Sequence, residues 1–98
     1  MILKSVFLNL NSNLGDVFKK RGVNPSGLNF DDLSTKDGIY WINLGTSEGT
    51  FPVSETYGML LAFSLDNAEA VQFFANENHI YSRFNVNKNW SVWRVLNN

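Results

Sequence analysis

The stretch Tyr57-Gly58-Met59-Leu60-Leu61-Ala62-Phe63-Ser64-Leu65 decides the fold class of this chain. In an extended segment, Met59, Leu61, Phe63 and Leu65 fall on one face, and Leu60 and Ala62 fall on the other. A single sheet in water tolerates one apolar face and not two. We therefore predict a strand that is covered on both sides, either by the N-terminal part of the chain and its long loops or by another subunit.

Further apolar runs, separated by turn residues, lie on both sides of this stretch. They are Ile39–Ile42 before it, and Ala70–Ala75, Ile80–Phe84 and Trp90–Leu96 after it. Their lengths and short links are typical of an antiparallel meander. The sequence thus predicts an all-β fold, a small antiparallel meander of about five strands that occupies residues 29–98.

A different pattern fills residues 1–28, which we assign to a separate N-terminal unit for attachment or oligomerisation. Apolar residues of both parities between Ile2 and Leu10 favour a strand covered on both sides. Asn13 is a suitable helix cap, the residues at 14, 17 and 18 are spaced as one helical face, and Gly22 can end the helix. The sequence therefore predicts an N-terminal strand and one short helix whose last turn contains Lys19–Arg21.

Composition restricts the possible functions. The 98 residues suffice for one compact domain, and they include no cysteine and a single histidine, His79, in an Asn-rich turn. Thiol catalysis and sites built on paired histidines are thereby excluded, and we predict no enzyme, no catalytic residues, no metal and no cofactor. The net charge of −1 disfavours nucleic acid, and no apolar run approaches the roughly 20 residues that cross a membrane. We expect synthesis in the cytoplasm, because the N-terminus lacks the pattern of a signal peptide.

The C-terminal hairpin carries the most distinctive side chains, and we select Tyr81, Arg83, Trp90, Trp93 and Arg94 as candidates for ligand or partner contact. Arginine stacks on aromatic rings and keeps its charge, so such a face can bind a ligand or can hold the hairpin together by packing. Large aromatic side chains are mostly buried, which favours packing. In a regular strand, Trp90 and Trp93 would point to opposite sides.

The order and spacing of several short motifs between Asn29 and Leu96 resemble the pyocin-knob-like domains of phage tail fibres. A glycine opens into a strand that bears Tyr and Trp, and a Tyr-x-Arg followed by Trp-x-x-Trp closes the domain. In this chain the motifs are Asp32–Thr35, Gly38–Ile42, Pro52, Gly58–Leu60, Val71–Phe74, Ile80–Arg83 and Trp90–Arg94. The resemblance implies a structural role in a virion, because such domains form knobs along trimeric fibres and are not known for catalysis.

From this resemblance we expect a phage virion protein, a fibre or tail appendage component that assembles with copies of itself. The expected partners are a homotrimer, other virion proteins and host cell-surface carbohydrate. A head fibre or capsid decoration protein without receptor binding is the alternative, and a polysaccharide-degrading enzyme is the least favoured interpretation. The two-sided apolar strands and the lack of cysteine also favour oligomerisation, since so small a domain has a thin margin of stability.

Overall fold

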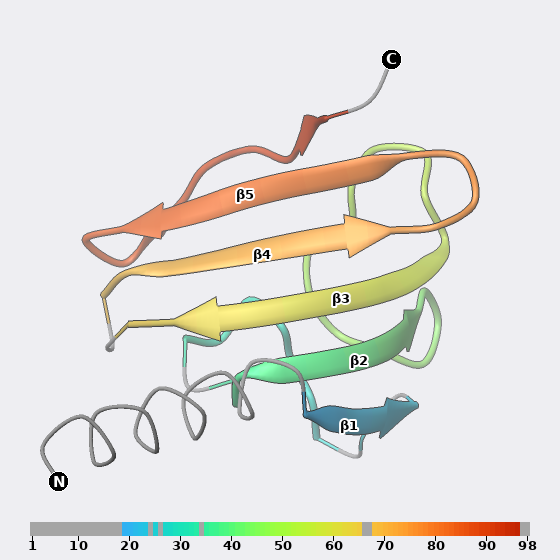
Figure 1. Ribbon diagram of the computed structural model, residues 1–98, viewed down its shortest axis with the longest axis horizontal. Coiled ribbons are helices and arrows are strands. Elements are labelled where there is room, and N and C mark those ends of the chain that lie inside the picture. The colour runs from blue at the N-terminus through green and yellow to red at the C-terminus, as the bar shows by residue number, and fades with distance from the viewer. Residues whose placement is uncertain (1–18, 24, 26, 34, 66–67, 97–98) are drawn as a thin grey trace, which may run out of the picture.

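One mixed β-sheet organises the chain (Figure 1). The computed structural model describes residues 19–23, 25, 27–33, 35–65 and 68–96. The strands are β1 (Lys20–Val23), β2 (Gly38–Asn43), β3 (Tyr57–Ser64), β4 (Ala70–Ala75), β5 (Ile80–Val86), β6 (Asn89–Trp90) and β7 (Arg94–Val95). They lie in the order β1-β2-β3-β4-β5-β6, and β7 also pairs with β5.

Strands β2 to β5 form the antiparallel meander that the sequence predicts. Tyr40 pairs with Leu60, Leu60 with Phe74, and Phe74 with Tyr81. This register places one row of large apolar residues across four strands on the same face. The all-β class and the meander are therefore confirmed.

The predicted helix is wrong at its C-terminal end, because Lys20–Val23 is strand β1. It runs parallel to β2, with a bulge between Lys20 and Gly22, and Gly22 has a φ of 108°. The Ile39 amide donates to the Lys19 carbonyl oxygen over 2.8 Å. Pairing with β2 thus prevails over the local helical pattern. The earlier part of the predicted helix and the strand from 2 to 10 lie outside the described residues.

β1 belongs to the same sheet as β2, although it falls in the part of the chain assigned to a separate N-terminal unit. No helix occurs in residues 19–23, 25, 27–33, 35–65 or 68–96. The described residues therefore contain no helix that could span a membrane.

The C-terminal run also differs from expectation. One strand from Trp90 to Leu96 was expected, but the chain forms β6, leaves the sheet, and returns as β7. Both short strands pair with β5. The Ser91 amide still reaches the Phe84 carbonyl oxygen over 2.7 Å, so the departure is brief. Its consequence is that Trp90 and Trp93 are not bound by the alternation of a regular strand.

One face of the sheet is covered by loops of the same chain, and we call it the covered face. The segment before β2 and the loop 44–56 pass behind the sheet in Figure 1. Phe30 from the first of these is fully buried against core residues of the strands. Its ring meets the Phe51 ring edge-on at 5.3 Å, and Phe51 meets Phe74 at 5.7 Å. The buried residues of this apolar core are Phe30, Tyr40, Ile42, Leu60, Ala62 and Phe74.

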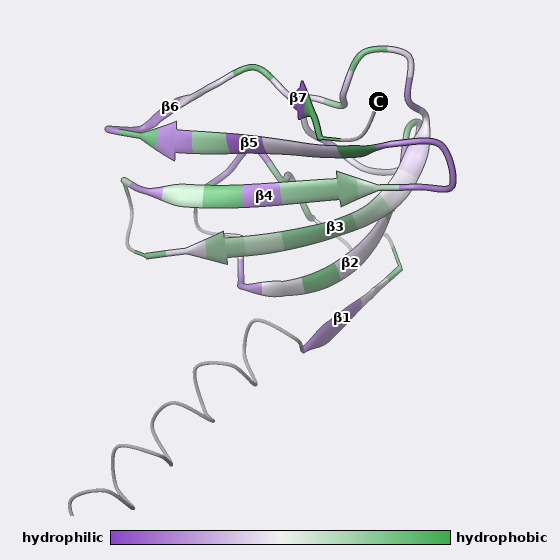
Figure 2. Cartoon of the chain, turned by 45° about the horizontal axis from the view of Figure 1, so that its top comes forward, coloured by the Kyte–Doolittle hydropathy of each residue, from purple (hydrophilic) through white to green (hydrophobic). Residues whose placement is uncertain are grey.

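The opposite face carries apolar side chains without a described covering element, and we call it the open face. In Figure 2 the strands of this sheet carry long hydrophobic stretches. Met59 is 49% exposed and Phe84 is 55% exposed, although both are strand residues. Other exposed apolar residues here are Phe63, Ile80 and Val86. Of the two apolar faces that the sequence predicts, the described residues therefore cover only one.

Candidate functional site

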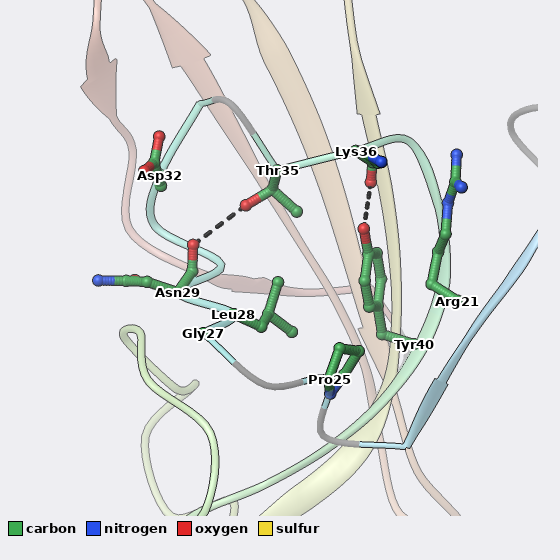
Figure 3. A pocket seen from close by; sticks show the side chains of 9 residues that line it. All are labelled: Arg21, Pro25, Gly27, Leu28, Asn29, Asp32, Thr35, Lys36 and Tyr40. Atoms are coloured by element: carbon green, nitrogen blue, oxygen red, sulfur yellow. Dashed lines mark hydrogen bonds between the residues drawn. The ribbon is translucent and has the colours of Figure 1, made fainter.

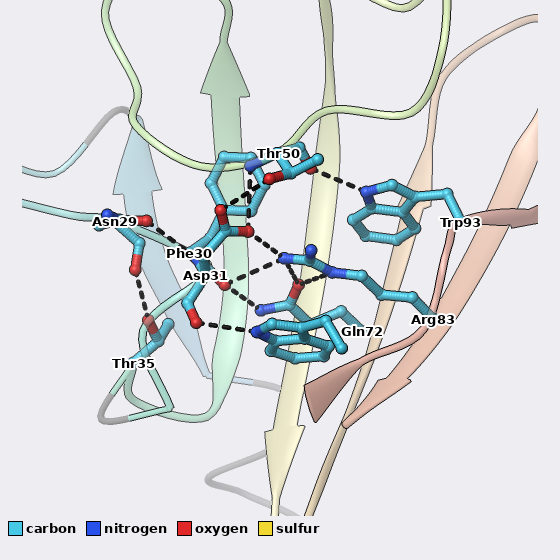
Figure 4. A network of polar contacts seen from close by, with 9 residues as sticks. Asn29, Phe30, Asp31, Thr35, Thr50, Gln72, Arg83 and Trp93 are labelled. Atoms are coloured by element: carbon cyan, nitrogen blue, oxygen red, sulfur yellow. Dashed lines mark hydrogen bonds and ion pairs between the residues drawn. The ribbon is translucent and has the colours of Figure 1, made fainter. Parts of the chain in front are cut away.

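Arg83 is the centre of the most elaborate polar arrangement in the described chain. It projects from β5 into the covered face, and only 2% of the residue is exposed. Its Nε and Nη2 donate to Gln72 Oε1 over 2.9 and 2.8 Å, and Nη2 also reaches Asp31 Oδ1 at 2.7 Å (Figure 4). Gln72 lies directly opposite on β4 and donates to the Phe30 carbonyl oxygen. A buried charge is tolerated when it is paired and hydrogen-bonded in this way.

Two indole rings complete the surroundings of this guanidinium. Its carbon lies 4.0 Å from the centre of the Trp90 ring and 4.5 Å from that of Trp93. Attraction between a cation and the face of an aromatic ring is strongest for tryptophan and gains strength on desolvation. We call Arg83, Gln72, Trp90, Trp93 and their partner Asp31 the arginine cage.

The cage also holds the covering loops on the sheet. Trp90 Nε1 donates to the Asp31 carbonyl oxygen over 2.8 Å, and Trp93 Nε1 donates to that of Thr50 over 2.7 Å. Thr50 in turn donates to both carboxylate oxygens of Asp31, through its amide and its hydroxyl. Loops that are far apart in sequence are therefore fixed to the same hairpin.

The ionisation of the pair follows from these contacts. Partial burial acts to raise the pKa of Asp31, but hydrogen bonds from Thr50 and Arg83 bring it below its usual value. Burial lowers the pKa of Arg83, and the bond to Asp31 opposes this effect. An arginine still keeps its proton at neutral pH. The cage is thus an ion pair with no net charge.

A hollow of about 550 Å³ opens beside the cage. Arg83, Trp90 and Trp93 line it together with Asp31 and Thr50. Its other walls are Phe51, Val53, Tyr81, Ser91, Val92 and Val95. The hollow therefore combines aromatic and aliphatic walls with a few polar groups, as small-molecule sites do.

Tyr81 connects the cage region to a second polar cluster. Its hydroxyl donates to Glu55 Oε2 over 3.0 Å, and Asn76 Nδ2 donates to Glu55 Oε1 over 2.9 Å. His79 Nδ1 lies 3.3 Å from the same carboxylate. The bond from Asn76, with those from Tyr81 and His79, lowers the pKa of Glu55, whereas burial opposes the shift. Burial and the bond to Glu55 raise the pKa of Tyr81. This cluster fixes the loop before β3 to the β4–β5 turn.

A third arrangement is a hollow of about 430 Å³ on the N-terminal side of the covering segment (Figure 3). Thr35 closes one wall by donating to the Asn29 carbonyl oxygen, and Tyr40 closes another by donating to that of Lys36. Arg21 borders the hollow, and its Nε donates to the Asp37 carbonyl oxygen over 2.7 Å. These polar side chains mainly fix the local backbone.

The structure brings four of the five predicted contact residues together. Tyr81, Arg83, Trp90 and Trp93 all line the hollow beside the cage. Arg94 does not join them: it is exposed on β7 opposite Ser82, and Ser82 points away from the face that bears Arg83. The expectation that Trp90 and Trp93 point to opposite sides is wrong, because the break between β6 and β7 lets both rings contact Arg83.

The sequence reasoning missed Asp31, Thr50 and Gln72. Gln72 left a signal, since it is a single polar residue within the apolar run Val71–Ala75, and a hairpin would place it opposite an arginine. Asp31 and Thr50 left none, because they come from separate loops that meet only in the folded chain. No group of three or more acidic or histidine side chains suited to a metal ion occurs in the described residues.

Comparison with known proteins does not place this chain in a family. No protein-family model matches it, and no curated protein or solved structure is similar to it at the significance required.

Proposed function

We propose that this chain is a structural protein of a phage virion, a fibre or tail appendage component that assembles with copies of itself and contacts the virion or the host surface. The phage assignment is supported by the ordered motifs that resemble pyocin-knob-like domains. Four residues of its closing motif, Tyr81, Arg83, Trp90 and Trp93, line one hollow. A motif whose parts meet in space is a better basis for a resemblance than scattered residues.

The open face is the single observation that carries self-assembly. Its side chains lie on four neighbouring strands, and Phe63, Ile80 and Phe84 are each exposed. Complete burial of one such side chain contributes ~1.5–3 kcal/mol relative to full exposure. Exposed apolar patches on strands mark association surfaces, and a second copy of the same chain is available wherever the chain is made. The proposed occupant is therefore a neighbouring copy, within a homotrimer.

Sedimentation of the purified chain at micromolar concentration tests this proposal. We expect the mass of a trimer, and we expect a double variant Phe63→Asp, Phe84→Asp to sediment as a monomer. The matched control is Val53→Asp, at an exposed valine of the loop 44–56 that lines the hollow on the covered face. A monomeric wild-type chain, or a trimer that is indifferent to the open-face aspartates, contradicts the assembly proposal.

Location in the particle distinguishes the two virion roles. Capture by purified tails supports the appendage role, and localisation in the particle by electron microscopy gives the attachment point. Capture by capsids alone would contradict the appendage role and favour a head fibre or capsid decoration protein.

A further inference from the structure

One terminal nitrogen of the Arg83 guanidinium, beside the hollow, has no hydrogen-bond partner among the described residues. Nε and Nη2 of Arg83 donate hydrogen bonds to Gln72, Asp31 and the Phe30 carbonyl oxygen. Its other terminal nitrogen, Nη1, has no hydrogen-bond partner among the described residues. In Figure 4 it is the guanidinium nitrogen without a dashed line, on the side toward Trp93. Arginine has five N–H donors in a fixed fork, so this donor is already oriented for an acceptor.

The charge of the site favours a neutral acceptor. Asp31 lies 2.7 Å from Arg83 and already balances its charge. A carboxylate or phosphate ligand would have to compete with Asp31 for the guanidinium, whereas a carbonyl oxygen can accept from Nη1 without disturbing the pair. The carbonyl oxygen of an amide is a common neutral hydrogen-bond acceptor.

The walls favour an apolar surface next to that acceptor. Val53 is 87% exposed and Val92 is 76% exposed, and both line the hollow together with the half-buried Trp93. Indole rings present a broad flat surface on which the C–H face of a sugar ring can lie. The valines are suitable neighbours for a methyl group.

We propose that this hollow binds a neutral sugar that carries an acetamido group. The acetamido carbonyl oxygen accepts from Arg83 Nη1, its methyl group contacts Val53 or Val92, and the sugar ring lies against Trp93. The cage itself stays intact, because both indole N–H groups remain bound to Asp31 and Thr50. The proposal rests on the proposed function in one respect, since it takes a host-surface glycan as the source of the sugar.

Nuclear magnetic resonance of the full ¹⁵N-labelled chain tests the site with N-acetylglucosamine as the probe. The chain has three tryptophans, so three indole N–H signals report separately. Trp93 lines the hollow, whereas Trp41 pairs with Met59 on the open face and is the internal control. We expect millimolar N-acetylglucosamine to shift the Trp93 signal in a saturable manner and to leave that of Trp41 in place.

Two further sugars test the chemistry. Glucose lacks the acetamido group, and glucuronate adds a negative charge, so both should bind about tenfold more weakly, the loss expected when one contact of ordinary strength is missing. Equal shifts with glucose would overturn the acetamido contact. Stronger binding of glucuronate would show that the site selects an anion, and no shift of Trp93 with any sugar would overturn the site.

Substitutions at the exposed walls avoid damage to the fold. Val53→Glu and Val92→Glu should each weaken binding of N-acetylglucosamine about tenfold, because they place a hydrated charge in the hollow. Val23→Glu, a similarly exposed valine on β1, should bind as the wild-type chain does. Unchanged binding by both wall variants would contradict the site. Because sedimentation measures assembly independently, a failed titration leaves the proposal of self-assembly to its own test.

Discussion

The two faces of this sheet are built from the same strands and yet differ in how deeply their side chains are buried. Leu60 and Phe74 point to the covered face and are fully buried, whereas Met59 and Phe63 point to the open face and are 49% and 40% exposed. The difference does not lie in the strands, whose side chains are apolar on both sides. It lies in the loops, which supply Phe30, Phe51 and Asp31 of the arginine cage to one side only.

Burial in this small sheet is decided by the face over which the connections pass. The loops are held on the covered face by specific bonds from Trp90 and Trp93 to loop carbonyl groups. Apolar area alone would not select one face over the other, because both faces have it. The hydrogen bonds and the ion pair make the selection among the described residues, and we propose that a second copy covers the open face.

The largest expected difference between the two faces is in the free energy of unfolding lost at Phe74 and at Phe73, which are adjacent on β4. Phe74→Ala should lower the free energy of unfolding by about 3–5 kcal/mol, because it leaves a cavity in the core. Phe73→Ala, on the open face, should lower that of the dissociated chain by about 1 kcal/mol or less, the range of many partly exposed positions. Urea unfolding at low protein concentration measures both, and equal losses would remove the distinction between the faces.

Removal of the central charge comes next. Arg83→Met should destabilise the chain by about 3 kcal/mol, at the lower end for a broken buried pair, because Asp31 is partly exposed and can regain water. Gln72 Oε1 would also lose the bonds from Arg83, and the Phe30 carbonyl oxygen would keep only the bond from Gln72. The matched control is Arg94→Met, which should change the urea midpoint little. A variant of Arg83 as stable as this control would show that the cage does not hold the loops.

Close packing at Gly58 gives a smaller effect. A Cβ atom there would lie 2.5 Å from the Phe74 ring and 2.8 Å from the Ala75 carbonyl oxygen. Gly58→Ala should therefore cost about 1–3 kcal/mol through overpacking, measured by thermal or urea unfolding. A neutral or stabilising Gly58→Ala would show that β3 and β4 pack less tightly than described.

The smallest expected effect is the pH dependence contributed by Asp31. Its pKa is lowered on folding, so its stabilisation is complete above the unfolded-state pKa of about 3.9 and is lost as the pH falls through the folded-state value. The urea midpoint should drop as the pH falls below about 4, and less steeply in Asp31→Asn. An identical drop in the two proteins would mean that the bonds from Arg83 and Thr50 do not favour the charged form.

Much of the sheet could be predicted from the sequence, because apolar runs and turn residues alternate with clear spacing. The strands from Gly38 to Val86 follow from that pattern. Two errors share one cause. Lys20–Val23 has a helical pattern but pairs with β2, and Trp90–Leu96 has a strand pattern but breaks between β6 and β7. In both places tertiary contacts prevail over local preference.

The candidate site was predictable in part for the same reason. The aromatic and arginine residues of one hairpin are near one another in sequence, so their meeting could be expected. Asp31 and Thr50 come from different loops, 19 residues apart, and become partners only when both loops cover the sheet. No pattern of residues close together in the sequence could predict such a contact.

The indole signal of Trp41, followed on dilution, shows whether copies of the chain associate through the open face. Trp41 lies on the open face beside Tyr57, at 5.7 Å between ring centres, whereas Trp90 and Trp93 lie on the covered face. If copies associate through the open face, the Trp41 signal should move as the protein is diluted to the concentration at which sedimentation shows dissociation, and the other two should stay in place. Association through the open face would be contradicted by a Trp41 signal that stays constant while sedimentation shows dissociation. It would also be contradicted if the signals of Trp90 and Trp93 moved instead.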